Sequence, residues 1–312
     1  MLSKLKVGIA GYGVVGKRRR LFIDQHESLQ TIAVCDRTFL DNDAPKDGVR
    51  YYTNYEDLLS EDIDVLFVCM TNDIAPEVTI SGLSQGVHVF CEKPPVVNLD
   101  ELNKLKKIKD SKSRRTFFNF NYRFSELNEI LKKYMNSKEI GKIIFIEIIA
   151  SQGLAFKKEY IDSWRADGRN NKFNLLDTVT IHYLDLINQH FGISKNQFYF
   201  PKLVSNNGTS YDTGHLLLEY DTFNVSIINS YATPFIGELL IIGTNGHISI
   251  KNDILEIKTP RDTFDKDNFF VSPPTLFTKK FNMQNDYYSS LKNSFNFFIS
   301  NVVNKKEFDI SL

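Results

Sequence analysis

The stretch that decides the fold is Val7-Gly8-Ile9-Ala10-Gly11-Tyr12-Gly13-Val14-Val15-Gly16. Gly11, Gly13 and Gly16 form the pattern G-x-G-x-x-G, which gains weight because it falls between a predicted strand (residues 5–10) and a predicted helix (14–24). In that setting the glycines permit a tight turn, admit a pyrophosphate to the backbone and let helix pack on strand. The N–H groups at the helix start would face the phosphates. The turn, with Tyr12, Val14 and Val15 in it, is therefore a candidate dinucleotide site.

An acidic residue follows this turn at the expected spacing. Asp36 comes twenty residues after Gly16, where the predicted second strand ends. A carboxylate at that place accepts hydrogen bonds from the ribose hydroxyls of an adenosine, which favours NAD as the cofactor. The next residue, Arg37, could pair with a 2′-phosphate, so NADP is kept as the alternative.

Up to about residue 120, short β-rich runs alternate with helical patterns, which is typical of βαβ units and a parallel sheet covered on both faces. The later strands predicted here are residues 31–35, 65–70, 87–90 and 116–120, and the helices are 14–24, 55–60, 75–85 and 99–110. The sequence therefore predicts the α/β class, with a doubly wound parallel sheet in a first domain of residues 1–120.

Beyond residue 120 the pattern changes to hairpin-type spacing. Turn signals such as Asn206-Asn207-Gly208 separate the β-rich runs. The predicted strands are residues 142–151, 198–204, 214–220, 225–230, 238–242, 247–250 and 254–258, with helices at 125–135, 175–190 and 286–303 and a loop at 259–282. We expect an α+β domain over residues 121–312, built on an open, mainly antiparallel sheet with helices on one face.

Composition limits the partners. Of 312 residues, 38 are Lys or Arg and 38 are Asp or Glu, so no net charge drives the chain onto nucleic acid or an anionic membrane. The apolar runs are far shorter than the ~20 residues of a membrane helix, and no export signal is visible. Cys35, Cys69 and Cys91 have neither disulfide nor metal-ligand spacing, which favours buried thiols in the cytoplasm. A small-molecule partner is the expectation.

A second candidate group, Glu92-Lys93-Pro94-Pro95, follows a predicted strand at the edge of the sheet where ligands bind. Lys93 alone could be a solvated turn lysine followed by a strand terminator. In the functional interpretation the prolines fix Lys93 so that its ammonium points at a nicotinamide and polarises a substrate oxygen.

A third candidate group lies on the predicted helix 175–190. Thr178, His182 and Asp185 are spaced i, i+4 and i+7 and share one face. A neutral imidazole suits proton transfer, and Asp185, one turn away, would orient it. A packing or surface histidine is the alternative. A metal bound by His182, Asp185 and His190 fits the spacing but has no support elsewhere, so no metal site is predicted.

With these motifs in order along the chain, the sequence resembles the glucose-fructose oxidoreductase and inositol dehydrogenase family (Gfo/Idh/MocA). The motifs are the glycine turn, Met70-Thr71-Asn72-Asp73, Glu92-Lys93-Pro94, Asn119-Phe120-Asn121-Tyr122-Arg123-Phe124, Ile140-Gly141-Lys142, Trp164-Arg165 and His182-Tyr183-Leu184-Asp185. The resemblance implies a Rossmann domain, a C-terminal domain whose open sheet often forms the oligomer interface, and hydride transfer between NAD(P) and a carbohydrate-like alcohol. Lys93 and His182 match the residues that flank the substrate in that family.

The resemblance also implies roles for further residues. Those expected at the cofactor are Met70, Thr71, Asn72, Glu92 and Lys93, and those expected at the substrate are Lys93, Asn121, Arg123, Trp164, Arg165 and Asp185. Basic and aromatic residues in the loop 151–174 favour a phosphorylated or nucleotide-linked sugar, for which surface carbohydrate synthesis is one setting. A homodimer or homotetramer through the C-terminal sheet is the expected assembly.

The sequence departs from the family near His182. The position four residues earlier, usually a carboxylate, is Thr178, and Asp177 lies five before, about 140° away on a regular helix. Either Thr178 replaces the acid, or a one-residue π-bulge brings Asp177 round. The preceding loop, residues 170–174, is bulkier than usual. Two other functions stay open: a catalytically silent dinucleotide-binding regulatory protein, and a reductase of a non-sugar carbonyl or imine, of the biliverdin or dihydrodiol type.

Overall fold

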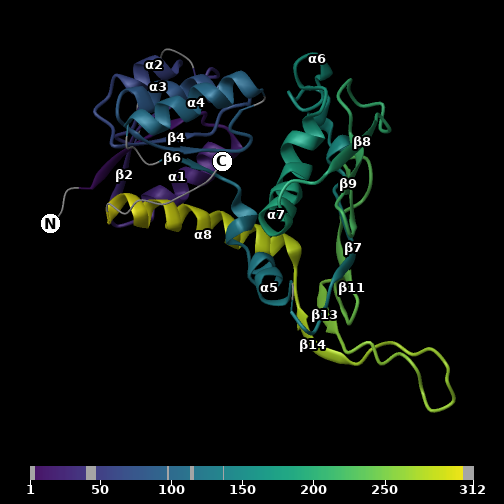
Figure 1. Cartoon of the computed structure of the whole chain (residues 1–312). Helices are drawn as coiled ribbons and strands as arrows, with labels where there is room; N and C mark the ends of the chain where they lie inside the picture. Colours follow the sequence, from purple (N-terminus) through teal and green to yellow (C-terminus); the bar gives the residue numbers. More distant parts are fainter. Residues whose placement is uncertain (1–3, 40–46, 97, 113–115, 136, 305–312) are drawn as a thin grey trace. The chain divides into compact units, whose positions relative to one another are not determined.

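The computed structural model describes residues 4–39, 47–96, 98–112, 116–135 and 137–304 (Figure 1). The chain divides into two compact units, Met1–Phe120 with Lys292–Leu312, and Asn121–Leu291. The first unit is therefore made from two separate stretches of sequence, and the helix α8 (Met283–Val303) runs from the second unit into the first.

The first unit is built on a parallel sheet of six strands in the order β3-β2-β1-β4-β5-β6. Its strands are β1 (Leu5–Ala10), β2 (Leu29–Cys35), β3 (Arg50–Tyr52), β4 (Val65–Val68), β5 (His88–Cys91) and β6 (Thr116–Phe118), and its helices are α1 (Val14–Asp24), α2 (Tyr55–Leu59), α3 (Ala75–Ser84) and α4 (Leu99–Lys112). The predicted doubly wound parallel sheet is confirmed. The sequence analysis missed β3, a strand of three residues at the sheet edge.

Both faces of this sheet are covered. Every residue of β4 is buried, as expected for a central parallel strand. On one face the rings of Phe67, Phe90 and Phe117 stack at centroid distances of 4.8 and 5.0 Å, and Phe295 and Phe298 of α8 pack against them. The C-terminal part of α8 thus belongs to the first unit, whereas the sequence analysis placed it in the second domain. Burial of these two phenylalanine side chains is the physical reason.

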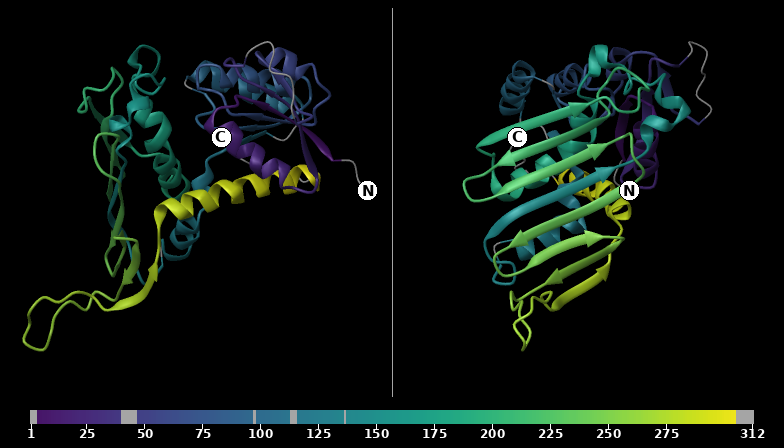
Figure 2. Two further views of the ribbon diagram at one scale, coloured as in Figure 1. Left: turned by 180° about the vertical axis from the view of Figure 1, so that it is seen from behind. Right: turned by 90° about the vertical axis from the view of Figure 1, so that its right-hand side faces the viewer.

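The second unit contains a sheet of eight strands in the order β14-β13-β12-β11-β7-β10-β9-β8 (Figure 2, right). The strands are β7 (Ile143–Ser151), β8 (Asn196–Lys202), β9 (Thr213–Glu219), β10 (Asn224–Ser230), β11 (Ile236–Gly243), β12 (His247–Lys251), β13 (Ile254–Lys258) and β14 (Thr275–Lys280). Only the β7–β10 pair in this sheet is parallel. The expected open, mainly antiparallel sheet is confirmed. The loop predicted over 259–282 is wrong at β14, which starts directly after Pro274 and pairs with β13.

The helical segments of the second unit are η1 (Asn121–Phe124), α5 (Glu126–Tyr134), η2 (Leu154–Phe156), η3 (Lys158–Tyr160), α6 (Gly168–Asn171), the π-helix η4 (Leu176–Thr180), α7 (Ile181–Phe191) and the start of α8. Leu131 of α5 and Leu186 of α7 pack on inward side chains such as Ile146 and Ile148, so the core lies between these helices and one sheet face (Figure 2, left). The alternating residues Glu147 and Ile149 point to the opposite face.

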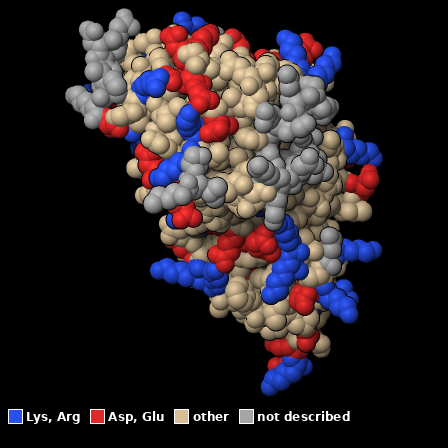
Figure 3. Space-filling view, turned by 90° about the vertical axis from the view of Figure 1, so that its left-hand side faces the viewer, with Lys and Arg blue, Asp and Glu red and all other residues tan. Residues whose placement is uncertain are grey.

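None of the described helices is long and apolar enough to cross a membrane. On the face drawn in Figure 3, basic and acidic side chains are interspersed.

Candidate active site

The glycine turn has the strand–turn–helix setting that the sequence predicts. Gly11 has φ +89°, and a Cβ there would lie 2.6 Å from the carbonyl oxygen of Cys69. A Cβ on Gly16 would lie 2.0 Å from the carbonyl oxygen of Gly11. Both positions therefore exclude any larger residue.

Gly13, the second glycine of the pattern, leaves room for a ligand. Gly13 is the N-cap residue of α1, and no side chain forms a capping hydrogen bond there. A Cβ added to Gly13 would meet no atom within 4 Å beyond its chain neighbours. The following residue, Val14, is 76% exposed. An uncapped helix N-terminus beside open space fits the pyrophosphate of a dinucleotide, because its N–H groups and the helix dipole favour anions.

Asp36 lies next to the same turn. Its Oδ2 accepts a hydrogen bond from the backbone N–H of Tyr12 at 2.8 Å, and its Oδ1 accepts from the N–H and hydroxyl of Thr38 at 3.0 and 2.8 Å. Burial alone would raise the pKa of Asp36, but these hydrogen bonds outweigh it and the pKa is lowered. The carboxylate is therefore ionised at neutral pH, while the Arg37 side chain is exposed.

A polar and aromatic group that the sequence analysis missed surrounds Tyr12. The Arg20 guanidinium donates to the hydroxyls of Tyr12 at 2.8 Å and Tyr51 at 3.1 Å and pairs with Asp47 at 2.5 Å. The rings of Tyr12, Tyr51 and Phe39 contact one another at 5.0–6.1 Å. These contacts fix the side chain of the turn residue. The sequence carries no signal for them, because they join α1 to residues near β3.

Lys93 follows the carboxyl end of β5. The N–H of Glu92 donates to the carbonyl of Val68 at 2.9 Å, so the chain is still held beside β4 immediately before Lys93. The Lys93–Pro94 peptide bond is cis, Pro94 and Pro95 are buried, and Lys93 is half-buried. Met70, Thr71 and Asn72 follow β4 at the same edge of the sheet and are also half-buried. These predicted cofactor residues therefore share the carboxyl edge of one sheet.

The carboxylate of Glu92, a predicted cofactor contact, is occupied within the protein. Arg19 donates to its Oε1 from Nε at 2.9 Å and from Nη2 at 2.6 Å. The amide of Asn119 donates to both carboxylate oxygens at 3.1–3.2 Å. Sequence reasoning found Glu92 but not these partners, since Arg19 lies 73 residues earlier in the chain.

In the second unit, the helix that carries His182 begins with a π turn. Residues Leu176–Thr180 form this turn, and α7 continues from Ile181. In a π turn the hydrogen bonds join residues five apart, so Asp177 and His182 come to the same side of the helix. The sequence analysis left this geometry open beside a regular helix. Asp177 is half-buried. Burial raises the pKa of Tyr199 to about 12, and the negative charge of Asp177 contributes to this rise.

Thr178 has partners of its own. Its hydroxyl donates to the carbonyl of Asn174 at 2.6 Å and lies 2.6 Å from the hydroxyl of Tyr231. Because the threonine proton is used on Asn174, Tyr231 is the donor in the second bond. Burial raises the pKa of Tyr231, with Thr178 and Arg165 opposing that rise, so this buried phenol stays protonated. Tyr231 was not predicted, because it directly follows β10, some fifty residues further along the chain.

His182 lies among tyrosines and is 7% exposed. Its ring centroid is 5.3 Å from that of Tyr122 and 6.0 Å from that of Tyr287. The hydroxyls of Tyr122 and Tyr183 are 3.2 Å apart, and burial raises the pKa of Tyr183 to about 12. The imidazole therefore has rigid aromatic neighbours that stay neutral in the physiological range.

Arg123 and Asp185 bind each other. The guanidinium donates to both carboxylate oxygens at 2.6–3.2 Å, and Asp185 is 9% exposed. Burial raises the pKa of Asp185 and Arg123 opposes that rise. Both oxygens of Asp185 thus accept from Arg123, and the orientation of the imidazole by Asp185 stays a prediction. His190 lies 2.9 Å from the side-chain oxygen of Asn128, and among the described residues no three His, Cys, Asp or Glu side chains form a metal site.

The remaining predicted substrate residues have different surroundings. Asn121 is fully buried and donates to Ser290 at 2.6 Å. The Arg165 guanidinium lies 4.5 Å from the centre of the Trp164 ring, and both residues are half-buried. Lys93 belongs to the first unit and His182 to the second.

The cysteines match the expectation for reduced thiols. Cys35 and Cys91 are buried, Cys69 is half-buried, and all three are free. Burial raises the pKa of Cys35 and of Cys91 to about 12, which keeps both thiols protonated and unreactive.

Comparison with known proteins agrees with this arrangement. Residues 5–120 match the model of the oxidoreductase family with an NAD-binding Rossmann fold, GFO_IDH_MocA. The chain is 25% identical over 185 residues to glucose-6-phosphate 3-dehydrogenase of Bacillus subtilis, covering 58% of this chain and 52% of that protein. It is 27% identical over 146 residues to D-glucoside 3-dehydrogenase of Escherichia coli, covering 45% and 42%. The chain thus spans about half the length of these curated relatives.

The fold is shared over nearly the whole chain. The crystal structure of myo-inositol 2-dehydrogenase from Lactobacillus plantarum matches with a TM-score of 0.78 at 22% identity, covering 99% of this chain and 92% of that one. Residues 5–120 are therefore similar to the NAD-binding Rossmann part of that oxidoreductase family, and the remainder of the chain shares the fold of the dehydrogenase structure.

Proposed function

We propose that the protein is an NAD-dependent dehydrogenase that interconverts a ring hydroxyl and a ketone in a sugar or a related cyclic polyol. The observation that carries this proposal is the uncapped start of α1 at Gly13, which faces open space beside the ionised Asp36. These features fit the pyrophosphate and the adenosine ribose of a dinucleotide. The names of the relatives, which act on glucose 6-phosphate and glucosides, support the substrate class.

NAD is favoured over NADP by the charge at the ribose position. The Asp36 carboxylate would accept from ribose hydroxyls and would repel a 2′-phosphate. The Arg37 side chain is exposed to solvent, and the hydroxyl of its neighbour Thr38 donates to Asp36. To offset the repulsion between Asp36 and a 2′-phosphate, the Arg37 guanidinium would have to give up its contact with solvent. We therefore expect a clear preference for NAD.

The chemistry needs an electrophilic group and a base. When bound, the nicotinamide accepts or donates the hydride. Lys93 binds the reacting oxygen through its ammonium and stabilises negative charge there. His182 takes the hydroxyl proton during oxidation and returns it during reduction. Asp177, brought to the same side of the helix by the π turn, stabilises the protonated imidazole. The engagement of the Thr178 hydroxyl with Asn174 and Tyr231 favours Asp177 for this role.

A phosphate on the sugar fits the loop that precedes this helix. Lys157 and Lys158 are exposed, whereas Arg169 already pairs with Asp167 at 2.8 Å. Arg165 stacks on Trp164 and keeps an orientation that suits both a sugar ring and an anion. We therefore infer that a phosphorylated or nucleotide-linked sugar is preferred to the free sugar.

The first experiment measures NADH formation with glucose, glucose 6-phosphate, UDP-glucose and myo-inositol, each with NAD⁺ or NADP⁺. We expect turnover with NAD⁺ and at least one phosphorylated sugar. The Lys93→Met variant should lose turnover by about 10²-fold or more while keeping NADH affinity, because it removes a transition-state charge without touching the glycine turn. Cofactor binding without turnover on any sugar would contradict the proposal and favour a silent or non-sugar function.

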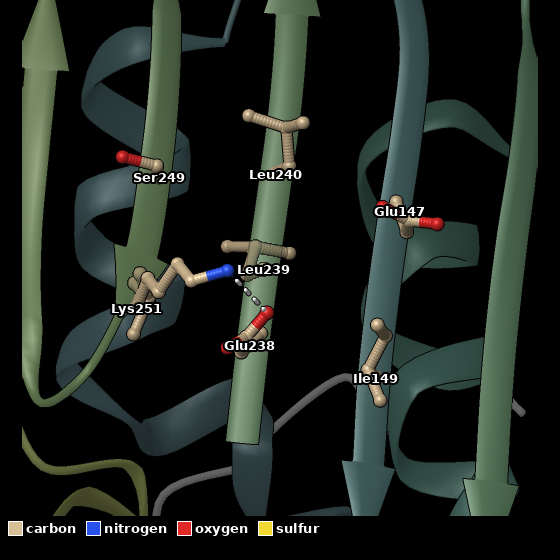
Figure 4. Close-up of a pocket in the computed structure, with 8 residues that line it drawn as sticks. Glu147, Ile149, Glu238, Leu239, Leu240, Ser249 and Lys251 are labelled. Atoms are coloured by element: carbon tan, nitrogen blue, oxygen red, sulfur yellow. Dashed lines mark ion pairs between the residues drawn. The ribbon is translucent and has the colours of Figure 1, made fainter. Parts of the chain in front are cut away.

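We further propose a homodimer or homotetramer through the open face of the second sheet. On these strands, outward-pointing side chains alternate with buried ones. The outward-pointing apolar side chains include Phe145, Ile149, Leu217, Ile228, Leu240 and Ile242. A shallow groove crosses β7, β11 and β12 there, where Lys251 lies 3.5 Å from Glu238 (Figure 4). Light scattering should give a multiple of 36.0 kDa, and Leu240→Lys should reduce it to the monomer. A monomeric wild-type protein would contradict this assembly.

A further inference from the structure

The Arg165 guanidinium of the second unit is a half-buried charge without an acidic partner in the part of the chain that the structure describes. It lies 4.5 Å from the centre of the Trp164 ring, and no described carboxylate forms an ion pair with it. Arg169, in the same loop, differs, because it is 85% exposed and pairs with Asp167 at 2.8 Å. A guanidinium that is partly withdrawn from water and has no counter-charge favours an anionic ligand.

A buried acid near this loop is occupied by other donors. Asp212 and Arg165 both influence the pKa of Tyr160, so both charges lie near that residue. The fully buried carboxylate of Asp212 accepts hydrogen bonds from the N–H groups of Val204 and Ser205 at 2.9 and 2.8 Å, and from the Ser205 hydroxyl at 2.6 Å. These neutral donors satisfy the carboxylate, and the charge of Arg165 stays available.

The backbone of Arg165 is held by two buried side chains. Its carbonyl oxygen accepts a hydrogen bond from the side-chain amide of Asn174 at 2.9 Å, and the Tyr160 hydroxyl lies 3.5 Å from the same oxygen. Asn174 is fully buried and Tyr160 is 2% exposed. The main chain at Arg165 is therefore fixed, and the direction of the guanidinium depends on the groups around the side chain.

The Tyr231 phenol is one of these groups. Tyr231 is 1% exposed, and its proton goes to the Thr178 hydroxyl at 2.6 Å, because Thr178 uses its own proton on the Asn174 carbonyl. The phenol oxygen can therefore only accept from Arg165, which lowers the pKa of Tyr231 against the effect of burial, both by its charge and by a side-chain hydrogen bond. The donors thus run in one direction, from Arg165 to the Asn174 carbonyl.

We infer that Tyr231 is a specificity-determining positioning residue, whose hydroxyl, fixed by Thr178, orients the Arg165 guanidinium toward the phosphate group of a phosphorylated or nucleotide-linked sugar. This inference rests on the proposed function and assigns the recognition of its substrate class to particular residues. A carboxylate at position 178 would place a negative charge beside Tyr231 and compete with a phosphate for Arg165. The neutral Thr178 thus has a role in the choice of substrate.

Binding can be measured directly, because Trp164 is the only tryptophan of the chain and its ring contacts Arg165. The full chain, without cofactor, is titrated with glucose 6-phosphate, UDP-glucose and glucose while tryptophan fluorescence is recorded. We expect a saturable change with a phosphate-bearing sugar at a concentration about tenfold or more below that needed with glucose. A tighter response to glucose 6-phosphate identifies a phosphate monoester as the ligand, and a tighter response to UDP-glucose identifies a diphosphate.

Steady-state kinetics test whether Tyr231 acts through Arg165. Arg165→Met should raise KM for the phosphate-bearing sugar about 100-fold and Tyr231→Phe about tenfold, with kcat within about threefold of wild type. The double variant should be no worse than Arg165→Met, because a residue that acts through another has no effect once that other is removed. KM for a sugar without phosphate should change by less than about threefold in all three variants.

Tyr220→Phe is the matched control, because it also removes a tyrosine hydroxyl that donates one hydrogen bond in the second unit, here to the Gly192 carbonyl at 2.9 Å. It should leave kcat, KM and the fluorescence response unchanged. Should Tyr231→Phe not fold, Thr178→Val removes the acceptor of the Tyr231 proton and should raise the same KM.

Three results would overturn the inference: no preference of Trp164 fluorescence for phosphate-bearing sugars, an unchanged KM in Tyr231→Phe, or losses that add in the double variant. A failure of the proposed function has a different signature. In that case no sugar is turned over with NAD⁺, while the fluorescence titrations of wild type, Arg165→Met and Tyr231→Phe still decide whether the two residues bind a phosphate.

Discussion

The glycine turn of the first unit and the His182 helix of the second are determined in different ways. At Gly11 and Gly16 backbone atoms occupy the space where a Cβ would be, so the residue type follows from local sterics. At the His182 helix, one extra residue in the π turn Leu176–Thr180 decides which side chains share a side. The first kind of site can be identified from a sequence pattern. The second depends on a hydrogen-bond register that residue types alone do not specify.

Removal of the His182 imidazole has the largest expected effect. Changing His182→Asn keeps a polar side chain of similar size but removes a base with a near-neutral pKa. We expect kcat to fall about 10²–10⁴-fold with NADH affinity unchanged, because the residue acts on the proton and not on the cofactor. Steady-state kinetics and NADH titration measure both. A fall of less than tenfold would mean that another group moves the proton.

The glycine turn can be tested by its two different glycines. Gly16→Ala places a Cβ 2.0 Å from the Gly11 carbonyl oxygen and should lower the free energy of unfolding by about 1–3 kcal/mol. Gly13→Ala meets open space and should leave that free energy nearly unchanged. Urea unfolding of the two variants gives the comparison. Equal stability would show that the turn relaxes more easily than its contacts indicate.

The register of the π turn is tested by its two neighbouring polar residues. Asp177→Asn removes a charge on the His182 side of the helix and should lower kcat about tenfold. Thr178→Val removes the bonds to Asn174 and Tyr231 and should affect the melting temperature more than kcat. The same kinetic assay and thermal unfolding apply to both. The opposite pattern would place Thr178, and not Asp177, beside the reacting proton.

The smallest expected effect concerns Asp36 and pH. Its hydrogen bonds with Thr38 and Tyr12 hold the folded-state pKa below the usual ~3.9, so the ionised form stabilises the fold at neutral pH. This stabilisation is fully present above about pH 4 and is lost as the pH falls through the lowered pKa. The difference in unfolding free energy between wild type and Asp36→Asn should therefore be largest near pH 7 and shrink in acid. Urea titrations at several pH values measure it, and a constant difference would contradict the lowered pKa.

Much of the fold follows from local pattern, and the misses have physical causes. The bounds of β1 and α1 agree with the structure, because a buried strand, a glycine turn and a helix each have their own sequence signal. The three-residue strand β3 and the strand β14 after Pro274 were missed, because pairing with a neighbour stabilises them more than their composition does. In the candidate site, the sequence pointed to individual residues but not to their partners in the fold. Arg19, Asn119 and Tyr231 are brought in from distant parts of the chain.

The two-stretch construction of the first unit has a consequence for the order in which the protein is made. The stacked rings of Phe67, Phe90 and Phe117 emerge from the ribosome early, whereas Phe295 and Phe298, which cover them, emerge only after the whole second unit. At a few to ~20 residues per second, that interval lasts about ten seconds or longer. Until then the face formed by Phe67, Phe90 and Phe117 lacks the cover that Phe295 and Phe298 give it in the folded protein.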